Sequence, residues 1–146
     1  MNKDYKPRKG SRLTKEQAEL YGNHIDVLME GRGGEITPQE ILEDATKISS
    51  PLHDHFEWSD TEAADKYRLD QARYLMINIV TVTIVAEKQT EQRSFWNVKN
   101  EVSGKKVYVK LKTATTNENY RNQLIDKITN HLNNTITLLK MFKQYG

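Results

Sequence analysis

The stretch that most constrains the fold of this chain is its C-terminal part, from Thr116 to Tyr145. Apolar side chains recur there at every third or fourth position, which predicts one long amphipathic helix. About 27 helical residues would span roughly 40 Å, which is more than a three-stranded sheet needs. We therefore expect part of the helix to pack against another subunit or a partner protein. The residues that we assign to this contact are Leu124, Ile128, Leu132, Leu139 and Phe142.

The segment before this helix has the composition of β-strands. Residues 77–86 are rich in β-branched side chains that alternate in polarity, which is typical of a half-buried strand. A polar turn follows at 87–92, and further strands are expected at 93–99 and 105–112. Short turns between successive strands indicate antiparallel pairing. The sequence therefore predicts a three-stranded antiparallel β-meander.

Helices are expected in the first half of the chain. Thr14 and Gln17 form a capping box at the start of one helix, and Thr37 and Glu40, with Pro38 between them, form a second. A DNA-binding helix-turn-helix pair is disfavoured, because the second helix is acidic and DNA phosphates would repel it. The predicted fold class is α+β, with N-terminal helices, a three-stranded antiparallel β-meander and a long C-terminal helix.

The connection from Ser50 to Trp58 holds a proline, two histidines and large side chains that belong to no helical row. We expect these side chains to fix the connection onto the core. Residues 59–62 form a third capping box, so a further helix should follow and end near Met76. The residues to which we assign this structural role are Pro51, Leu52, His53, Phe56, Trp58, Tyr67 and Arg68.

The length of 146 residues suits a single domain with a substantial core, and we expect residues 14–146 to form it. Residues 1–13 are basic and poor in apolar side chains, so we expect them to be a flexible arm. The absence of cysteine excludes disulfides and thiolate metal sites. No apolar run is long enough to span a membrane, and the N-terminus lacks the apolar stretch of a signal peptide.

Charge is distributed unevenly, although the net charge is only +2. Residues 26–66 contain eleven acidic and three basic side chains, a net charge of −8. Residues 87–146 contain five acidic and eleven basic side chains, a net charge of +6. Two interpretations are open: ordinary pairing of charges across the fold, or a basic surface that binds nucleic acid.

One face of the predicted sheet combines basic and aromatic side chains. Because side chains alternate across a strand, Lys106 and Tyr108 share the face opposite to Val107 and Val109. Such a face could bind single-stranded nucleic acid, with lysines contacting phosphates and rings stacking on bases. The alternative is a solvated face whose lysines protect a sheet edge. The residues assigned to nucleic-acid binding are Arg93, Phe95, Lys99, Lys106, Tyr108, Lys110 and Lys112 in the sheet, and Arg8, Lys9 and Arg12 in the arm.

Candidate catalytic groups are few. His53 and His55, next to Glu57, could contribute to a metal site, but a site needs further ligands at defined places. We favour the interpretation that His53 hydrogen-bonds the backbone and that His55 is exposed. The sequence has no phosphate-binding glycine loop and no nucleophile motif. We therefore predict no enzyme activity, no metal, no cofactor and no small-molecule substrate.

Three runs between Ile36 and Arg73 carry a resemblance: residues 36–45 (ITPQEILEDA), residues 50–60 (SPLHDHFEWSD) and the pattern AAxxYRxxQAR at 63–73. Together they resemble a group of small phage and prophage proteins of uncharacterised function. In that group a β segment and a closing long helix follow, as in this chain. The resemblance implies a phage or mobile-element origin and a setting in the host cytoplasm, and it implies no particular activity.

Two functional hypotheses follow from these observations. The first is a non-catalytic, phage-encoded accessory protein that binds nucleic acid through the basic sheet face and the N-terminal arm. The alternative is a protein-interaction component, either a virion or assembly part or an inhibitor of a host defence protein. It would use the long C-terminal helix and the acidic region 26–66. We expect a nucleic-acid or protein partner or a homo-oligomer, no membrane, and localisation in the host cytoplasm or the virion.

Overall fold

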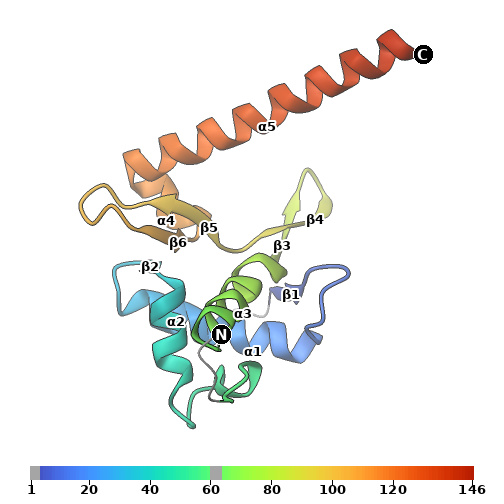
Figure 1. Ribbon diagram of the computed structural model, residues 1–146. Coiled ribbons are helices and arrows are strands. Elements are labelled where there is room, and N and C mark those ends of the chain that lie inside the picture. The colour runs from blue at the N-terminus through green and yellow to red at the C-terminus, as the bar shows by residue number, and fades with distance from the viewer. Residues whose placement is uncertain (1–3, 60–63) are drawn as a thin grey trace.

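The computed structural model describes residues 4–59 and 64–146 and has an α+β fold (Figure 1). The helices are α1 (Lys15–Glu30), α2 (Pro38–Ala45), α3 (Ala64–Asn78), α4 (Leu111–Thr116) and α5 (Glu118–Tyr145), with a short 3-10 helix η1 (His53–His55). The strands are β1 (Tyr5–Pro7), β2 (Glu35–Ile36), β3 (Ile79–Val85), β4 (Lys88–Arg93), β5 (Trp96–Lys99) and β6 (Lys106–Val109). The predicted fold class and the long C-terminal helix are confirmed.

The strands form two antiparallel sheets instead of the single meander that was predicted. The strand order is β1-β3-β4 in the first sheet and β2-β6-β5 in the second. The expected turn at 87–92 is largely strand β4, which pairs with β3 from Val80↔Arg93 to Val85↔Lys88. The β3–β4 hairpin projects from the body (Figure 1), and β4 has no buried residue. The polar composition of β4 therefore led to the prediction of a turn.

The chain leaves the first sheet at Ser94 and enters the second at Trp96. The Ser94 amide donates to the Ile79 carbonyl at 3.3 Å, and the next side chain, Phe95, is fully buried among the helices. Because the Phe95 side chain points into the core, the chain changes direction between β4 and β5. Strand β5 therefore pairs with β6 and not with β3. Strand β6 is shorter than predicted because Leu111 already begins helix α4.

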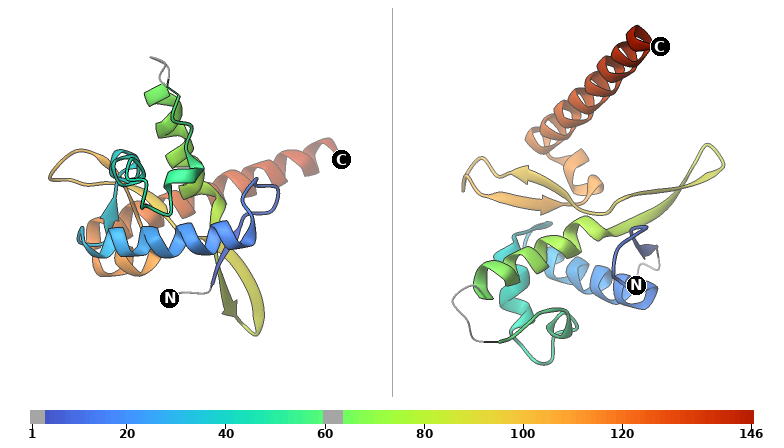
Figure 2. Two further views of the ribbon diagram at one scale, coloured as in Figure 1. Left: turned by 90° about the horizontal axis from the view of Figure 1, so that it is seen from below. Right: turned by 45° about the vertical axis from the view of Figure 1, so that its right-hand side comes forward.

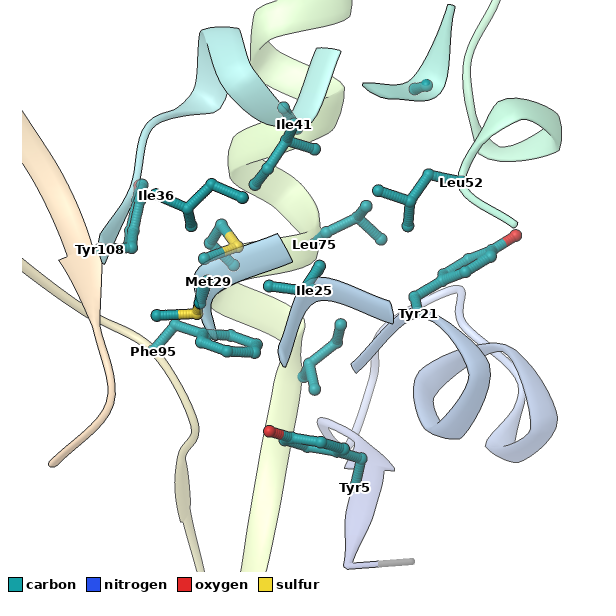
Figure 3. Packing of buried hydrophobic residues seen from close by; sticks show 14 of the residues in the cluster. Tyr5, Tyr21, Ile25, Met29, Ile36, Ile41, Leu52, Leu75, Phe95 and Tyr108 are labelled. Carbon is teal, nitrogen blue, oxygen red and sulfur yellow. The ribbon is translucent and has the colours of Figure 1, made fainter. Parts of the chain in front are cut away.

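The main hydrophobic core lies between helices α1, α2 and α3 and one face of the second sheet (Figure 3). Both predicted capping boxes are present: Thr14 with Gln17 starts α1, and Thr37 with Glu40 starts α2. The apolar face of each helix points into this core. Its buried members include Tyr21, Ile25, Met29, Ile36, Ile41, Leu52, Leu75, Met76, Ile79, Phe95 and Tyr108.

A second, smaller core covers the opposite face of the second sheet. It is formed by side chains of β5 and β6 and by helix α4 and the first turns of α5. Strand β6 therefore has buried side chains on both faces, since Val107 and Val109 contact this core and Tyr108 contacts the main core. The members of the smaller core are Val98, Val107, Val109, Ala114, Tyr120 and Leu124, with Trp96 packed against them.

Part of the segment that was predicted to be a flexible arm is instead a packed strand. Residues 5–7 form strand β1, which pairs with β3 from Tyr5↔Thr81 to Pro7↔Ile79. The Tyr5 side chain is fully buried and its hydroxyl donates to Asp26 at 2.6 Å. One aromatic side chain among many charges was enough to anchor the segment. Residues 1–3 of the predicted arm lie outside the described residues.

The connection between α2 and α3 is fixed to the core as predicted. Leu52 and Phe56 are buried, and the His53 ring donates from Nδ1 to the Ala45 carbonyl at 2.7 Å. The Trp58 ring stacks on His53 with ring centroids 5.0 Å apart, and the Arg68 guanidinium lies 5.1 Å from the centre of the Trp58 ring. These contacts hold the connection as one packed unit.

Three details of this connection differ from expectation or fall outside the described residues. His55 is partly buried and not exposed, because its ring donates from Nε2 to the Gln71 carbonyl at 3.0 Å. Tyr67 is 55% exposed and so contributes little to the core, whereas Pro51 is partly buried. The third capping box falls largely on residues 60–63, which lie outside the described residues.

Candidate interaction surface

Helix α5 is attached to the body only at its N-terminal end. Of its 28 residues only Tyr120 and Leu124 are buried, and every residue from 125 to 145 is exposed. Figures 1 and 2 show the helix running past the second sheet and away from helices α1 to α3. We call residues 125–145 the projecting part of α5. At 1.5 Å per residue it is about 31 Å long.

The base of α5 covers the free edge of strand β5. Gln123 accepts a hydrogen bond from the Lys99 amide at 2.9 Å and donates to the Lys99 carbonyl at 2.8 Å. One turn later, the Lys127 ammonium group donates to the Asn97 carbonyl. These two side chains satisfy backbone groups that would otherwise be open to another strand. The direction in which α5 leaves the body is therefore fixed by hydrogen bonds as well as by packing.

The partly buried acid Glu35 also anchors the base of the helix. The Tyr120 hydroxyl donates to one oxygen of Glu35 in strand β2, and Asn100 donates to the other at 2.9 Å. Burial of the phenol, together with the adjacent Glu35 carboxylate, raises the pKa of Tyr120 to about 12. The phenol stays protonated and keeps donating throughout the physiological range. Tyr120 thus connects α5 to the strand on the far side of the second sheet.

The projecting part carries a continuous stripe of large apolar side chains. Each is between 42% and 84% exposed, and none belongs to either hydrophobic core. The stripe occupies positions a, d, e and g of a heptad that starts at Ile125, whereas b, c and f are polar apart from Met141. The residues of this apolar stripe are Ile125, Ile128, Leu132, Ile136, Leu138, Leu139, Phe142 and Tyr145.

The sequence of the projecting part is poorly suited to a helix that stands alone. From Thr129 to Thr137 every residue except Leu132 and Ile136 is Thr, Asn or His, and these have low intrinsic helix propensity. Asp126 is the only acid beyond the base, so Glu–Lys pairs along the helix are absent from residues 125–145. In proteins most helical stability comes from packing of an amphipathic face and not from propensity. This helix therefore depends on contacts with its apolar stripe.

Four of the five residues predicted for a helix-mediated contact lie in the apolar stripe. Ile128, Leu132, Leu139 and Phe142 are exposed at 54%, 56%, 54% and 75%. Leu124 is instead buried in the smaller core, because it faces the second sheet. Tyr145, 84% exposed, was missed although it follows Leu138 by one heptad.

Two aromatic residues predicted to stack on nucleic-acid bases are buried. Phe95 and Tyr108 belong to the main core, with exposed fractions of 0% and 6% (Figure 3). The prediction that they face outward is wrong, because the face assumed to be solvated is covered by helices α1 to α3. Lys110 forms an ion pair with Asp26 at 2.8 Å, which uses its charge within the fold.

Other predicted nucleic-acid contacts remain on the surface. Lys99 and Lys106 are exposed partners across β5 and β6. Arg93 is partly buried over the Trp96 ring, 5.5 Å from its centre. Burial, with Arg93 and Lys106 close by, lowers the pKa of Lys127. We call Arg93, Lys99, Lys106 and Lys127 the basic cluster. Lys112 is exposed in α4, and Arg8, Lys9 and Arg12 are exposed before α1.

His53 and His55, the histidines that suggested a metal site, each donate to a backbone carbonyl and so help to hold the fold together. Within residues 4–59 and 64–146 no three His, Asp or Glu side chains are grouped so that they could hold a metal ion. His24 contacts the buried Asp44 at 2.7 Å, and Ser50 donates to the same oxygen at 2.6 Å. Burial alone would raise the pKa of Asp44, but these hydrogen bonds outweigh it and the pKa is lowered.

No protein-family model, curated protein or solved structure matches this chain. None of the helices in the described parts of the chain is both long and apolar enough to cross a membrane. The most distinctive feature of the molecule is the projecting part of α5.

Proposed function

We propose that this protein is a non-catalytic interaction component that binds protein through the projecting part of α5. The observation that carries the proposal is the apolar stripe, with eight large apolar side chains exposed along one helix. Exposed apolar surface that is contiguous over such a length marks a contact site. A helix with this pattern binds by laying its apolar side against another helix or in a groove.

The anchoring of the helix base supports the same proposal. Tyr120, Gln123 and Lys127 hold the start of α5 on the second sheet, so the helix is presented in a defined direction. A rigid base reduces the entropy lost when the apolar stripe is covered. The acidic region 26–66 was a second candidate contact in the sequence, but Asp26 pairs internally with Lys110, and the buried Asp44 contacts His24 and Ser50.

A phage or prophage setting, in the host cytoplasm or the virion, belongs to the proposal as well. It is supported by the resemblance of residues 36–73 to small phage proteins. A virion or assembly part and an inhibitor of a host defence protein both need such a protein-binding surface, and neither needs an active site.

Site-specific photo-crosslinking tests the proposal. A photoreactive residue at Leu139, in the apolar stripe, should form an adduct with protein in cells. The same residue at Thr137, on the polar side of the helix, should not. The two sites are two residues apart, so both variants should fold alike. Absence of any protein adduct at Leu139 would overturn the proposal.

Nucleic-acid binding is a second candidate function, favoured by the basic cluster. Three of its members are close enough for their charges to act on one another, and Lys99 lies opposite Lys106. Cations gathered in this way can contact phosphates. Fluorescence anisotropy with single-stranded and duplex DNA at two salt concentrations tests it. Combining Lys99→Glu with Lys106→Glu should abolish binding, whereas Lys88→Glu on the hairpin should leave it intact. Binding that the double substitution leaves unchanged would reject this function.

A further inference from the structure

We propose that the apolar stripe is covered by a second copy of this chain, and that the two α5 helices pair antiparallel. This inference deepens the proposed function, on which it rests, by naming the partner. The interface would be formed by residues 125–145 of each copy. The bodies of the two molecules would then lie at opposite ends of the helix pair.

The size of the apolar stripe fits a pair of this kind. From typical side-chain areas and the exposed fractions, the stripe offers on the order of 700 Å² of apolar surface per molecule. A stable interface of standard size buries about 800 Å² per partner. One helix of equal length and equal apolar content is therefore sufficient to cover it, and α5 itself is such a helix.

Layer geometry favours the antiparallel arrangement. In one antiparallel register, two residues face each other when their numbers add up to 267. Each residue at heptad position a of one copy then meets a residue at position d of the other. Phe142 then packs on Ile125, and Thr135 on Leu132. Phe142 thus meets a smaller side chain, Thr135 meets a larger one, and Leu139 meets Ile128, which is of equal size, so the layers fill space evenly. Parallel pairing would instead place Phe142 on Phe142 and Thr135 on Thr135, giving one crowded and one underfilled layer.

Charge does not oppose contact between identical helices. From Ile128 to Leu139 there is no Asp, Glu, Lys or Arg. The polar side of this region is Asn and Thr, so two copies meet without like-charge repulsion. Antiparallel pairing also opposes the two helix dipoles and separates the Lys140 and Lys143 side chains of one copy from those of the other. Lys140 then lies level with Lys127 of the second copy, but both are at the outer heptad positions b and c, away from the contact.

Light scattering after size-exclusion chromatography tests the pairing. The wild type should have twice the 17.0 kDa mass of the chain, and Leu132→Asp should have the mass of one chain. Leu132 belongs to neither core, so the variant body should fold, which circular dichroism checks. Val102→Asp is the matched control, because Val102 is 99% exposed outside α5 and its variant should remain paired. A wild type that has the mass of one chain overturns the inference.

Disulfide formation tests the orientation, since the chain has no cysteine of its own. The double variant Ile125→Cys with Phe142→Cys should form a covalent dimer on oxidation, and Ile125→Cys alone should not. Within one helix these positions are about 25 Å apart, so they cannot bond to each other. Efficient dimerisation of Ile125→Cys alone would show parallel pairing and overturn the antiparallel arrangement.

The photo-crosslinking experiment separates failure of this inference from failure of the proposed function. An adduct at Leu139 with a second copy supports both. Adducts with other proteins alone support the proposed function and overturn the inference.

Discussion

The ring of Tyr5 lies directly against the backbone of helix α1 at Gly22. A Cβ atom at Gly22 would come within 2.5 Å of the Tyr5 ring. The close approach places the Tyr5 hydroxyl on Asp26 and allows the ring to stack on Phe95 with centroids 6.0 Å apart. This one contact attaches strand β1 to the main core.

Gly22→Ala should therefore destabilise the protein, although alanine favours helices. Moving the Tyr5 ring should cost about 1–3 kcal/mol, which exceeds the helix-propensity gain of about 1 kcal/mol. Urea unfolding measures the difference. Gly31→Ala is the matched control, because its Cβ would meet nothing closer than 3.7 Å and its φ is −70°. Equal stabilities for the two variants would contradict the account.

The β3–β4 hairpin turns through Ala86 and Glu87, which have φ of 50° and 64°. Two left-handed residues in a two-residue loop suit Asn-Gly, and each other L-residue there costs about 1 kcal/mol or more. Ala86→Asn with Glu87→Gly should slow amide exchange in β3 and β4. Glu87→Gln, which keeps the Cβ and removes the charge, should leave exchange unchanged. Faster exchange in the double variant would contradict the assigned turn.

Stability should fall as the pH drops through about 6.5, partly because of His55. Burial lowers the pKa of His55 below that ordinary value, and its bond to the Gln71 carbonyl only partly offsets this. The unfolded chain therefore takes up a proton at a higher pH than the folded chain, so lowering the pH favours unfolding until the folded pKa is passed. His55→Gln should weaken this dependence in urea unfolding. His131→Gln, at an exposed site, should not.

Gln123→Ala should lower the free energy of unfolding by about 1–2 kcal/mol, because it removes two hydrogen bonds to the backbone of Lys99. Amides of β5 should also exchange faster, since its edge is then open. Gln144→Ala, near the exposed end of α5, should change neither the free energy of unfolding nor the exchange of the β5 amides. An unchanged exchange rate in β5 would show that packing alone holds the base of the helix.

Local features of the sequence predicted the helices well. The capping boxes at Thr14 and Thr37 depend on side chains three residues apart, and both formed as expected. The packing of elements that lie far apart in the sequence was harder to predict. The alternation in β6 correctly separated Val107 and Val109 from Tyr108, but alternation does not reveal that both faces of a strand are covered.

The candidate interaction surface was partly predictable, because the apolar spacing along a helix is a local feature of the sequence. The spacing of Ile128, Leu132 and Leu139 identified the apolar side of α5 from the sequence alone. Where the helix leaves the body depends on Gln123 and Lys127 meeting strand β5, which lies more than twenty residues away in the chain. Such contacts follow from the folded arrangement and have no sequence spacing of their own.

Hydrogen exchange of the projecting part of α5 tests the central claim most directly. Residues 125–145 have low helix propensity, so they should be protected only when the apolar stripe is covered. We expect slow exchange in the wild type and fast exchange in Leu132→Asp, with helices α1 to α3 unchanged between the two. Equally fast exchange of residues 125–145 in both proteins would contradict the claim that a second copy covers this helix.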